Sequence, residues 1–220
     1  AAALPAALQA QRPLTIDDYG RWRTIEDAGI SGNGRWVAYT LRHTNVPEDD
    51  EDPVLHIRDL ETDREIRVPN AHSPEFSRDS RWVVYEVDEV KKERARRGAD
   101  TDTAAADTAA ADSAAAPASE QRFELRELAT GRTRSWERVQ TATFNHTSTH
   151  LLLRRRAAAG GRNGRGDADA RGADYLLHDL ADGRGLFLGA VSDAAFSRQG
   201  DLLAYAVQAP VKDGNGLFVL

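Results

Sequence analysis

The chain has 220 residues, of which 40% are hydrophobic and 29% are charged, and its formal net charge is −6. This composition allows a globular core, and the negative charge argues against a body that binds nucleic acid through phosphate contacts. Cysteine is absent, which excludes disulfides, thiolate metal sites and cysteine nucleophiles.

The N-terminal residues resemble an export signal. Methionine is absent even at position 1, so we expect the N-terminus to be missing or processed. Residues 1–11, which begin AAALPAALQA, resemble the end of a signal-peptide hydrophobic region with small residues near its cleavage point. The alternative is an Ala-rich disordered leader. We expect an exported protein, periplasmic or extracellular, without a membrane span, because no apolar stretch approaches the ~20 residues that a bilayer requires.

A helical lead is predicted over residues 12–26. Thr15 suits an N-cap, and Asp18 stands three residues later, as in a capping box. Tyr19 and Trp22 would then share one helix face, which we expect to dock the lead against the following domain.

Two local patterns recur along the rest of the chain. The first is an apolar residue, a short polar turn and an apolar run, found at residues 30–39, 76–85, 144–153 and 196–205. The second is a short β-hairpin with a polar turn, found at residues 57–64, 125–132 and 177–184. Each hairpin leads to the next copy of the first pattern at a constant spacing of 17 residues, from Leu60 to Ser77, Leu128 to Asn145 and Leu180 to Ser197.

Four-stranded units with constant spacing are typical of propeller blades. We therefore predict an all-β fold, a partial β-propeller of about three and a half four-stranded blades. The predicted blades span residues 27–71, 72–140 and 141–190, with an incomplete fourth blade at 191–220. A β-sandwich would not require the constant spacing. Closed propellers have typically four to eight blades, so we expect the chain to be a piece of a longer protein.

Only the connection between the second and third strand of each blade varies in length, so all insertions should emerge on one face, opposite the turns that join first and second strands. Residues 98–119 contain 11 alanines and predict a flexible insertion, preceded by a charged arm at 88–97; a second flexible insertion is predicted at 154–173. The tripeptide 165–167 spells an adhesion motif and the run 48–52 is acidic, but neither has the context of a binding site.

Ser31 lies between glycines, as a nucleophile or a phosphate-binding loop would require. However, the G-x-S-x-G motif fails because Asn33 stands two residues after the serine, and the run that follows is a strand rather than a helix. We interpret the stretch as a tight turn in which Gly32, Asn33 and Gly34 supply positive φ angles.

The histidines form no predicted site. His146 and His150 have a helical metal-pair spacing but flank a turn, and the repeats align His150, as a packing residue, with Trp36, Trp82 and Leu202. The others form no cluster by spacing: His43, His56, His72 and His178. We predict no catalytic, cofactor-binding or metal-ligating residue in this chain, and no cofactor.

The pattern Ser-x-Asn/Asp-Gly/Ser-Arg-Trp-Val-x-Tyr at residues 31–39 and 77–85, with the lead at 14–22, resembles exported bacterial serine peptidases of the prolyl oligopeptidase family. The resemblance covers roughly residues 12–220, all within that family's N-terminal propeller. Propellers of the periplasmic Tol-Pal type share the blade motif, but the lead and the charged arm favour the peptidases.

This resemblance implies a substrate-gating propeller above an α/β-hydrolase domain that this chain lacks, in a peptidase that hydrolyses short peptides. Its partners would be that missing C-terminal domain of the same chain and peptide substrates, without nucleic acid. The catalytic Ser, Asp and His of the family would lie after the propeller, so none is carried over here. The alternative is a non-catalytic periplasmic propeller that acts as a protein-interaction module.

Overall fold

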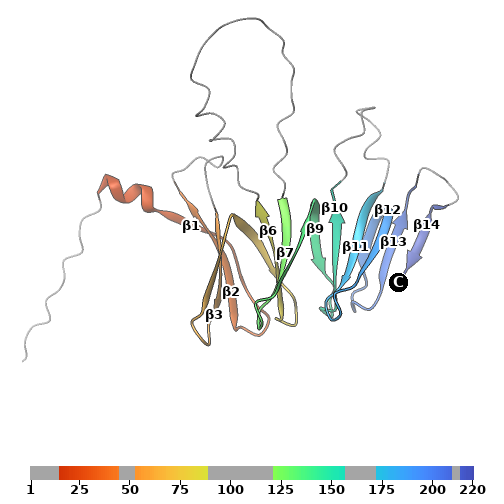
Figure 1. Ribbon diagram of the computed structural model, residues 1–220, viewed down its shortest axis with the longest axis horizontal. Helices are drawn as coiled ribbons and strands as arrows, with labels where there is room; N and C mark the ends of the chain where they lie inside the picture. Colours follow the sequence, from red (N-terminus) through yellow and green to blue (C-terminus); the bar gives the residue numbers. More distant parts are fainter. Residues whose placement is uncertain (1–14, 45–52, 89–120, 157–171, 210–213) are drawn as a thin grey trace, which may run out of the picture.

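The computed structural model describes residues 15–44, 53–88, 121–156, 172–209 and 214–220 (Figure 1). Within these ranges it contains fourteen strands and a short 3₁₀ helix, arranged in two four-stranded sheets and one six-stranded sheet. The all-β partial propeller predicted from the sequence is confirmed. The leader at 1–11, most of the arm at 88–97, the insertion at 98–119, the acidic run at 48–52 and the tripeptide at 165–167 lie outside the described residues.

The lead is shorter than predicted. The 3₁₀ helix η1 covers Ile16–Arg21, and strand β1 already begins at Arg23, inside the range predicted as helical. The backbone N–H of Thr15 donates to Oδ2 of Asp18, as in a capping box, and the Thr15 hydroxyl donates to the same oxygen. The expected docking is wrong, because Tyr19 and Trp22 stack on each other at 4.6 Å and stay 54% and 43% exposed.

The first two sheets are complete antiparallel blades. Blade 1 consists of β1 (Arg23–Ile30), β2 (Trp36–His43), β3 (Val54–Asp59) and β4 (Glu65–Pro69). Blade 2 consists of β5 (Ala71–Phe76), β6 (Trp82–Asp88), β7 (Gln121–Glu127) and β8 (Thr133–Glu137). Sequential strands pair within each blade, as in an antiparallel meander.

Blades 3 and 4 share one strand. The six-stranded sheet contains β9 (Val139–Phe144), β10 (His150–Arg155), β11 (Ala173–Asp179), β12 (Gly185–Phe196), β13 (Leu203–Val207) and β14 (Gly216–Val219). The sequence predicted a boundary after residue 190, but β12 runs through it because Val191 pairs with both Ala173 and Val207. The first half of β12 therefore closes blade 3, and its second half opens blade 4.

The blades stand side by side with their turns at one edge (Figure 1). The strand ends that flank the variable connections lie together at the opposite edge, upper in Figure 1: His43, Asp88, Arg155 and Val207. The antiparallel order of the strands produces this segregation, as predicted, because the connections from second to third strand all leave the same edge.

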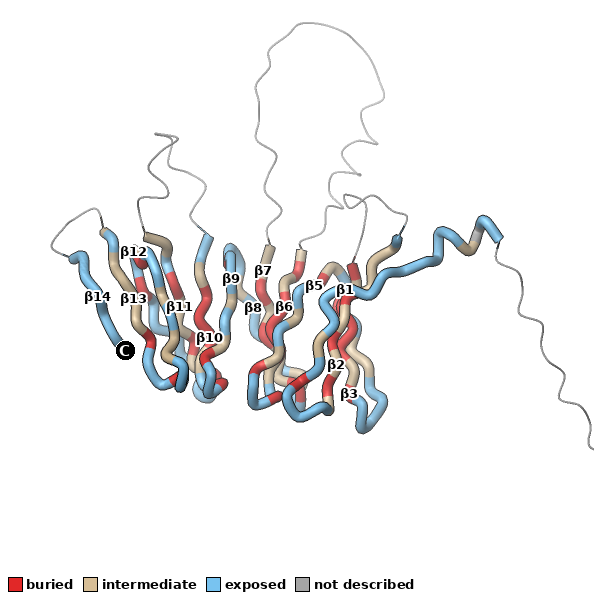
Figure 2. Tube along the Cα trace, turned by 180° about the vertical axis from the view of Figure 1, so that it is seen from behind, coloured by how far each residue is buried: buried red, intermediate tan, exposed pale blue. Residues whose placement is uncertain are grey.

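Every inner blade has apolar side chains buried on both faces, and Figure 2 shows the buried residues along its strands. Val83 and Tyr85 pack in a cluster with the strands of blade 1, whereas their neighbour Val84 packs in a separate cluster with blade 3. In the same way Leu151 and Leu153 face blade 2, and Leu152 faces blade 4. Side chains alternate between faces along a strand, so each uninterrupted apolar run is buried from both sides.

Ser31 is a structural residue of the first turn. It is 3% exposed, and its Oγ accepts a hydrogen bond from the backbone N–H of Trp36 at 2.9 Å. Of the three residues predicted to have positive φ, only Gly34 does, at 72°. Gly32 lies close to the next turn, where an added Cβ would be 3.1 Å from the carbonyl oxygen of Arg78, a tight contact.

Successive turns are joined by buried serine hydroxyls. The backbone N–H of Asn33 donates to Oγ of Ser80 at 3.0 Å, and that of Asp79 donates to Oγ of Ser148 at 3.1 Å. Ser80 and Ser148 are each 6% exposed and have φ angles of 60° and 55°. Their left-handed backbone costs free energy, which the bond between blades offsets.

Three equivalent leucines provide an internal test of blade packing. Leu128 and Leu180 are buried against the preceding blade, at 2% and 7% exposure, whereas Leu60 in blade 1 is 51% exposed. We expect Leu128→Ala and Leu180→Ala to lower the free energy of unfolding by about 2–4 kcal/mol. Leu60→Ala should cost less than about 1 kcal/mol. Urea unfolding measures all three; an equal loss at Leu60 would show that another surface covers blade 1.

The serine link between turns predicts an order of stability. Ser80→Ala keeps the unfavourable φ and leaves the Asn33 N–H without its acceptor, so we expect a loss of about 1–3 kcal/mol. Ser80→Gly also loses the bond but relieves the backbone, and should be less harmful. Thermal and urea unfolding distinguish them, with Ser135→Ala on exposed strand β8 as the control. A Gly variant less stable than the Ala variant would contradict this account.

Candidate functional site

The blades approach one another at their first strands, where β1 contacts β5. In a propeller these strands surround the central channel, so their polar side chains are the first candidates for function. Irregularities in pairing interrupt β1 between Glu26 and Gly29, and β5 between His72 and Glu75. Bulges of this kind redirect side chains and are frequent beside functional sites.

A chain of hydrogen-bonding groups lies at these two bulges. Oγ of Ser73 lies 3.0 Å from Nδ1 of His72, and Nε2 of His72 lies 3.2 Å from Oδ2 of Asp88. Gln121 also donates to Asp88, at 3.3 Å. The backbone N–H of Ser73 donates to Oδ2 of Asp27 at 3.1 Å, which joins the group to blade 1. The order Asp–His–Ser is that of a nucleophilic triad.

The backbone N–H of Ser73 is not free to stabilise an oxyanion. Acyl transfer requires backbone N–H groups or other donors aimed at the developing negative charge. Here the N–H of Ser73 is already bonded to the carboxylate of Asp27, so negative charge occupies the place where donors are needed. These contacts join β5 to β1, β6 and β7.

Repeat alignment could have pointed to this region. Asp27 and Ser73 each stand four residues before the serine that begins the first turn of their blade, Ser31 or Ser77. Thr141 and Asp193 occupy the same position in blades 3 and 4. The position is therefore polar in every copy although its neighbours vary. The contribution of Asp88 was not visible, because it comes from the far end of another strand.

The remaining histidines are distributed over separate environments. His56 lies 2.9 Å from Glu65 and stacks on Tyr39 at 5.0 Å. His178 is buried beside Trp136 and Arg134, and burial, together with the charge of Arg134, lowers its pKa. Nδ1 of His43 is buried and has no hydrogen-bond partner in the described parts of the chain.

His146 and His150 are not a metal pair. His146 contacts Arg78 of blade 2, and a guanidinium only donates. His150 stands at the aligned position of Trp36, but its side chain is 36% exposed and lies 3.8 Å from Asp179. The expected packing role is therefore replaced by a polar contact. No group of three His, Asp or Glu residues within the described ranges is placed to hold a metal, and no described helix is long and apolar enough to cross a membrane.

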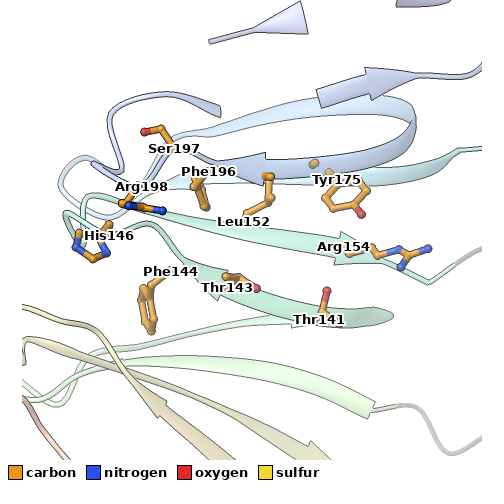
Figure 3. A pocket seen from close by; sticks show the side chains of 12 residues that line it. Thr141, Thr143, Phe144, His146, Leu152, Arg154, Tyr175, Phe196, Ser197 and Arg198 are labelled. Atoms are coloured by element: carbon orange, nitrogen blue, oxygen red, sulfur yellow. The ribbon is translucent and has the colours of Figure 1, made fainter. Parts of the chain in front are cut away.

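A pocket of about 440 Å³ opens between blades 3 and 4 (Figure 3). Thr141 and Thr143 on β9 line it together with Leu152 and Arg154 on β10 and Tyr175 on β11. The opposite wall is the second half of β12 and its turn, from Ala194 to Arg198. The small side chains of Ala194 and Ala195 leave this space open beside the first strand of each blade.

No protein-family model and no curated protein matches the chain. Solved structures do match it. The β-propeller domain of the Trilobed protease from Pyrococcus furiosus has a TM-score of 0.50 and 13% identity, over 90% of this chain and 53% of that chain. Several of the solved structures that match this chain contain propellers of prolyl oligopeptidase-family peptidases. The resemblance predicted from the sequence is thereby confirmed at the level of the fold.

Two further peptidases extend this comparison. The acylaminoacyl peptidase of Pyrococcus horikoshii has a TM-score of 0.51 and 12% identity, over 86% of this chain and 28% of that chain. Prolyl oligopeptidase B from Galerina marginata, in a complex with a 25mer macrocyclization substrate, has a TM-score of 0.50 and 11% identity, over 94% and 28%. The chain thus spans about half of the first neighbour and about a quarter of the others. At these identities the likeness establishes a shared fold.

The burial of a carboxyl group on β6, that of Glu86, predicts a pH dependence of stability. Desolvation raises the pKa of Glu86 above its usual value of 4.5. The folded state therefore binds this proton more tightly than the unfolded state, so this group's contribution to stability is present below pH 4.5 and is lost as pH rises through the folded pKa. We expect Glu86→Gln to be more stable than the parent at pH 7 and similar to it at pH 4.

Urea unfolding at pH 4, 5.5 and 7 checks this expectation. Glu137→Gln, on exposed strand β8, is the matched control and should shift stability equally little at each pH. A Glu86→Gln variant that is less stable at pH 7 would show that the charges of His72 and Arg156, which favour the carboxylate, outweigh its desolvation.

Proposed function

We propose that this chain is the substrate-gating propeller of a serine peptidase that hydrolyses short peptides. The observation that carries the proposal is the shared fold with the propellers of three peptidases, over 86–94% of this chain. In this proposal a nucleophilic serine, its histidine base and an aspartate belong to an α/β-hydrolase domain of the same polypeptide. The propeller limits which substrates reach them.

The distribution of chemistry over the described residues supports this division of labour. Ser73 is in line with a histidine and a carboxylate. Its backbone N–H, which an oxyanion hole would use as a donor, is bonded to Asp27. Ser31, the serine between glycines, is 3% exposed and bonded within its turn. A domain that selects substrates without transforming them needs neither group as a nucleophile.

The two terminal blades also support a larger propeller. Leu60, on the blade 1 face that turns away from blade 2, is 51% exposed, and Leu217 and Val219 on β14 are 73% and 59% exposed. The equivalent positions in inner blades are buried by a neighbour. Further blades on both sides would remove this apolar surface from water and close a channel around the first strands.

Gating by such a channel is steric. A peptide in an extended conformation can pass between the first strands, whereas a folded domain of 100 residues, with a radius of gyration of about 13 Å, is excluded. Export to the periplasm or outside the cell, which the pattern of residues 1–11 favours, belongs to the same proposal and suits an enzyme that processes peptides.

The reading frame that encodes the chain gives the first test. We expect it to continue into a G-x-S-x-G motif between strand and helix patterns, with Asp and His further on. A stop codon soon after the propeller is complete would contradict the proposal.

The size filter gives the second test, on the complete polypeptide. We expect kcat/KM to fall at least tenfold between peptides of about 8 and about 40 residues that share one cleavage sequence. A catalytic-serine-to-alanine variant is the control for contaminating peptidases, and the isolated 220-residue chain should hydrolyse neither peptide. Equal rates for both lengths would exclude gating.

A further inference from the structure

The pocket between blades 3 and 4 has an unusual charge for this acidic chain. Among its described lining residues none carries a carboxylate, whereas two arginines, a histidine and four hydroxyl groups line it: Arg154, Arg198, His146, Thr141, Thr143, Tyr175 and Ser197. The nearest carboxylates along β12 and its turn are engaged locally. Asp193 accepts from the N–H of Ala194, and Asp201 accepts from Ser197.

Arg154 supplies a donor that the described protein does not satisfy. It stands on β10 between Thr141 and Tyr175, with which it pairs, so its side chain is held in the wall of the pocket. Its Nε is buried and has no hydrogen-bond partner among the described residues. A buried donor without an acceptor leaves this guanidinium incompletely compensated, and because the side chain lines the pocket, a carboxylate bound there would supply the opposite charge.

A second cationic group lies at the other end of the pocket. Arg198, in the turn after β12, is near His146, and Arg154 is at the opposite end (Figure 3). Arg78 of blade 2 contacts His146 from outside the pocket and adds positive charge there. Thr141 and Thr143 lie along the wall between the two ends, where they can bond a backbone.

The distance between the two ends suits a short peptide. Along β9 the pocket extends from Thr141 to Phe144 and on to His146, which at about 3.3 Å per residue is roughly 10–16 Å. An extended peptide has the same rise and its side chains alternate between faces, so two acidic side chains four residues apart share one face and are about 13 Å apart, within this range. A single inorganic anion would occupy one end only.

We propose that this pocket binds an extended acidic peptide segment, with one carboxylate at Arg154 and a second at Arg198. Binding itself does not depend on the proposed peptidase function. If that function holds, the pocket opens beside the strands that line the channel, and it favours acidic peptides among those that enter.

The isolated chain tests the proposal with a matched pair of peptides. Ac-Glu-Ala-Ala-Ala-Glu-NH2 should bind at least tenfold more tightly than Ac-Gln-Ala-Ala-Ala-Gln-NH2 in titration calorimetry at low salt. Binding should weaken in 0.5 M NaCl, because salt screens the charges. In NMR titrations the backbone amides of Thr141 and Thr143 should shift, whereas those of blade 1 should not.

Variants assign the binding to the two arginines. Arg154→Gln and Arg198→Gln should each weaken the acidic peptide about tenfold, and Arg154→Lys should retain part of the affinity. Arg64→Gln, in an exposed turn of blade 1, is the control and should bind as the parent does. Thermal unfolding verifies folding; if Arg154→Gln does not fold, Arg198→Gln in its exposed turn still decides the question.

Several outcomes would overturn the proposal. Equal affinity for the acidic and neutral peptides would exclude charge recognition, and unchanged binding in Arg198→Gln would place the peptide elsewhere. Inorganic phosphate that binds as tightly as the peptide would mean a general anion site. If the acidic peptide binds as expected but the complete polypeptide shows no peptidase activity, the proposed function fails and the binding site stands.

Discussion

Face-to-face packing of sheets is the interaction on which the rest of this structure depends. Each inner blade carries apolar side chains on both faces, so it is stable only between two neighbours. Val83 and Val84 are adjacent in sequence but belong to two different cores. The hydrophobic core of the described residues is therefore a series of separate layers, one between each pair of neighbouring blades. A substitution that removes apolar contacts in one layer acts directly on the two blades that form it.

The same packing makes the two edges of the propeller different. At the turn edge the blades come so close that a Cβ on Gly200 would lie 2.7 Å from the backbone nitrogen of His146, and serine hydroxyls join successive turns. Such an edge tolerates little variation. The other edge carries the connections of variable length, so the length of the chain can vary there without disturbing the packing between blades.

One position on the second strand shows how each gap obtains its own chemistry. It is Thr40 in blade 1, Glu86 in blade 2 and Arg154 in blade 3, and each side chain faces the next blade. Burial raises the pKa of Glu86, which lies near His72, whereas Arg154 leaves a donor unpaired in the pocket of the next gap. A repeated backbone thus places a carboxylate in one blade and a guanidinium at the same position of the next, without any change in strand order.

The sequence by itself determined the fold class, the repeat of four-stranded blades and the place of the turns between first and second strands. Periodic apolar runs and a constant spacing of 17 residues depend on local strand geometry, which is written in consecutive residues. Only the tertiary structure decided the continuous strand β12, the exposed stack of Tyr19 on Trp22, the alignment of Ser73 with His72 and Asp88, and the cationic pocket. These features join residues from different strands or blades, and their contacts depend on how far neighbouring sheets approach and rotate, which no local pattern specifies.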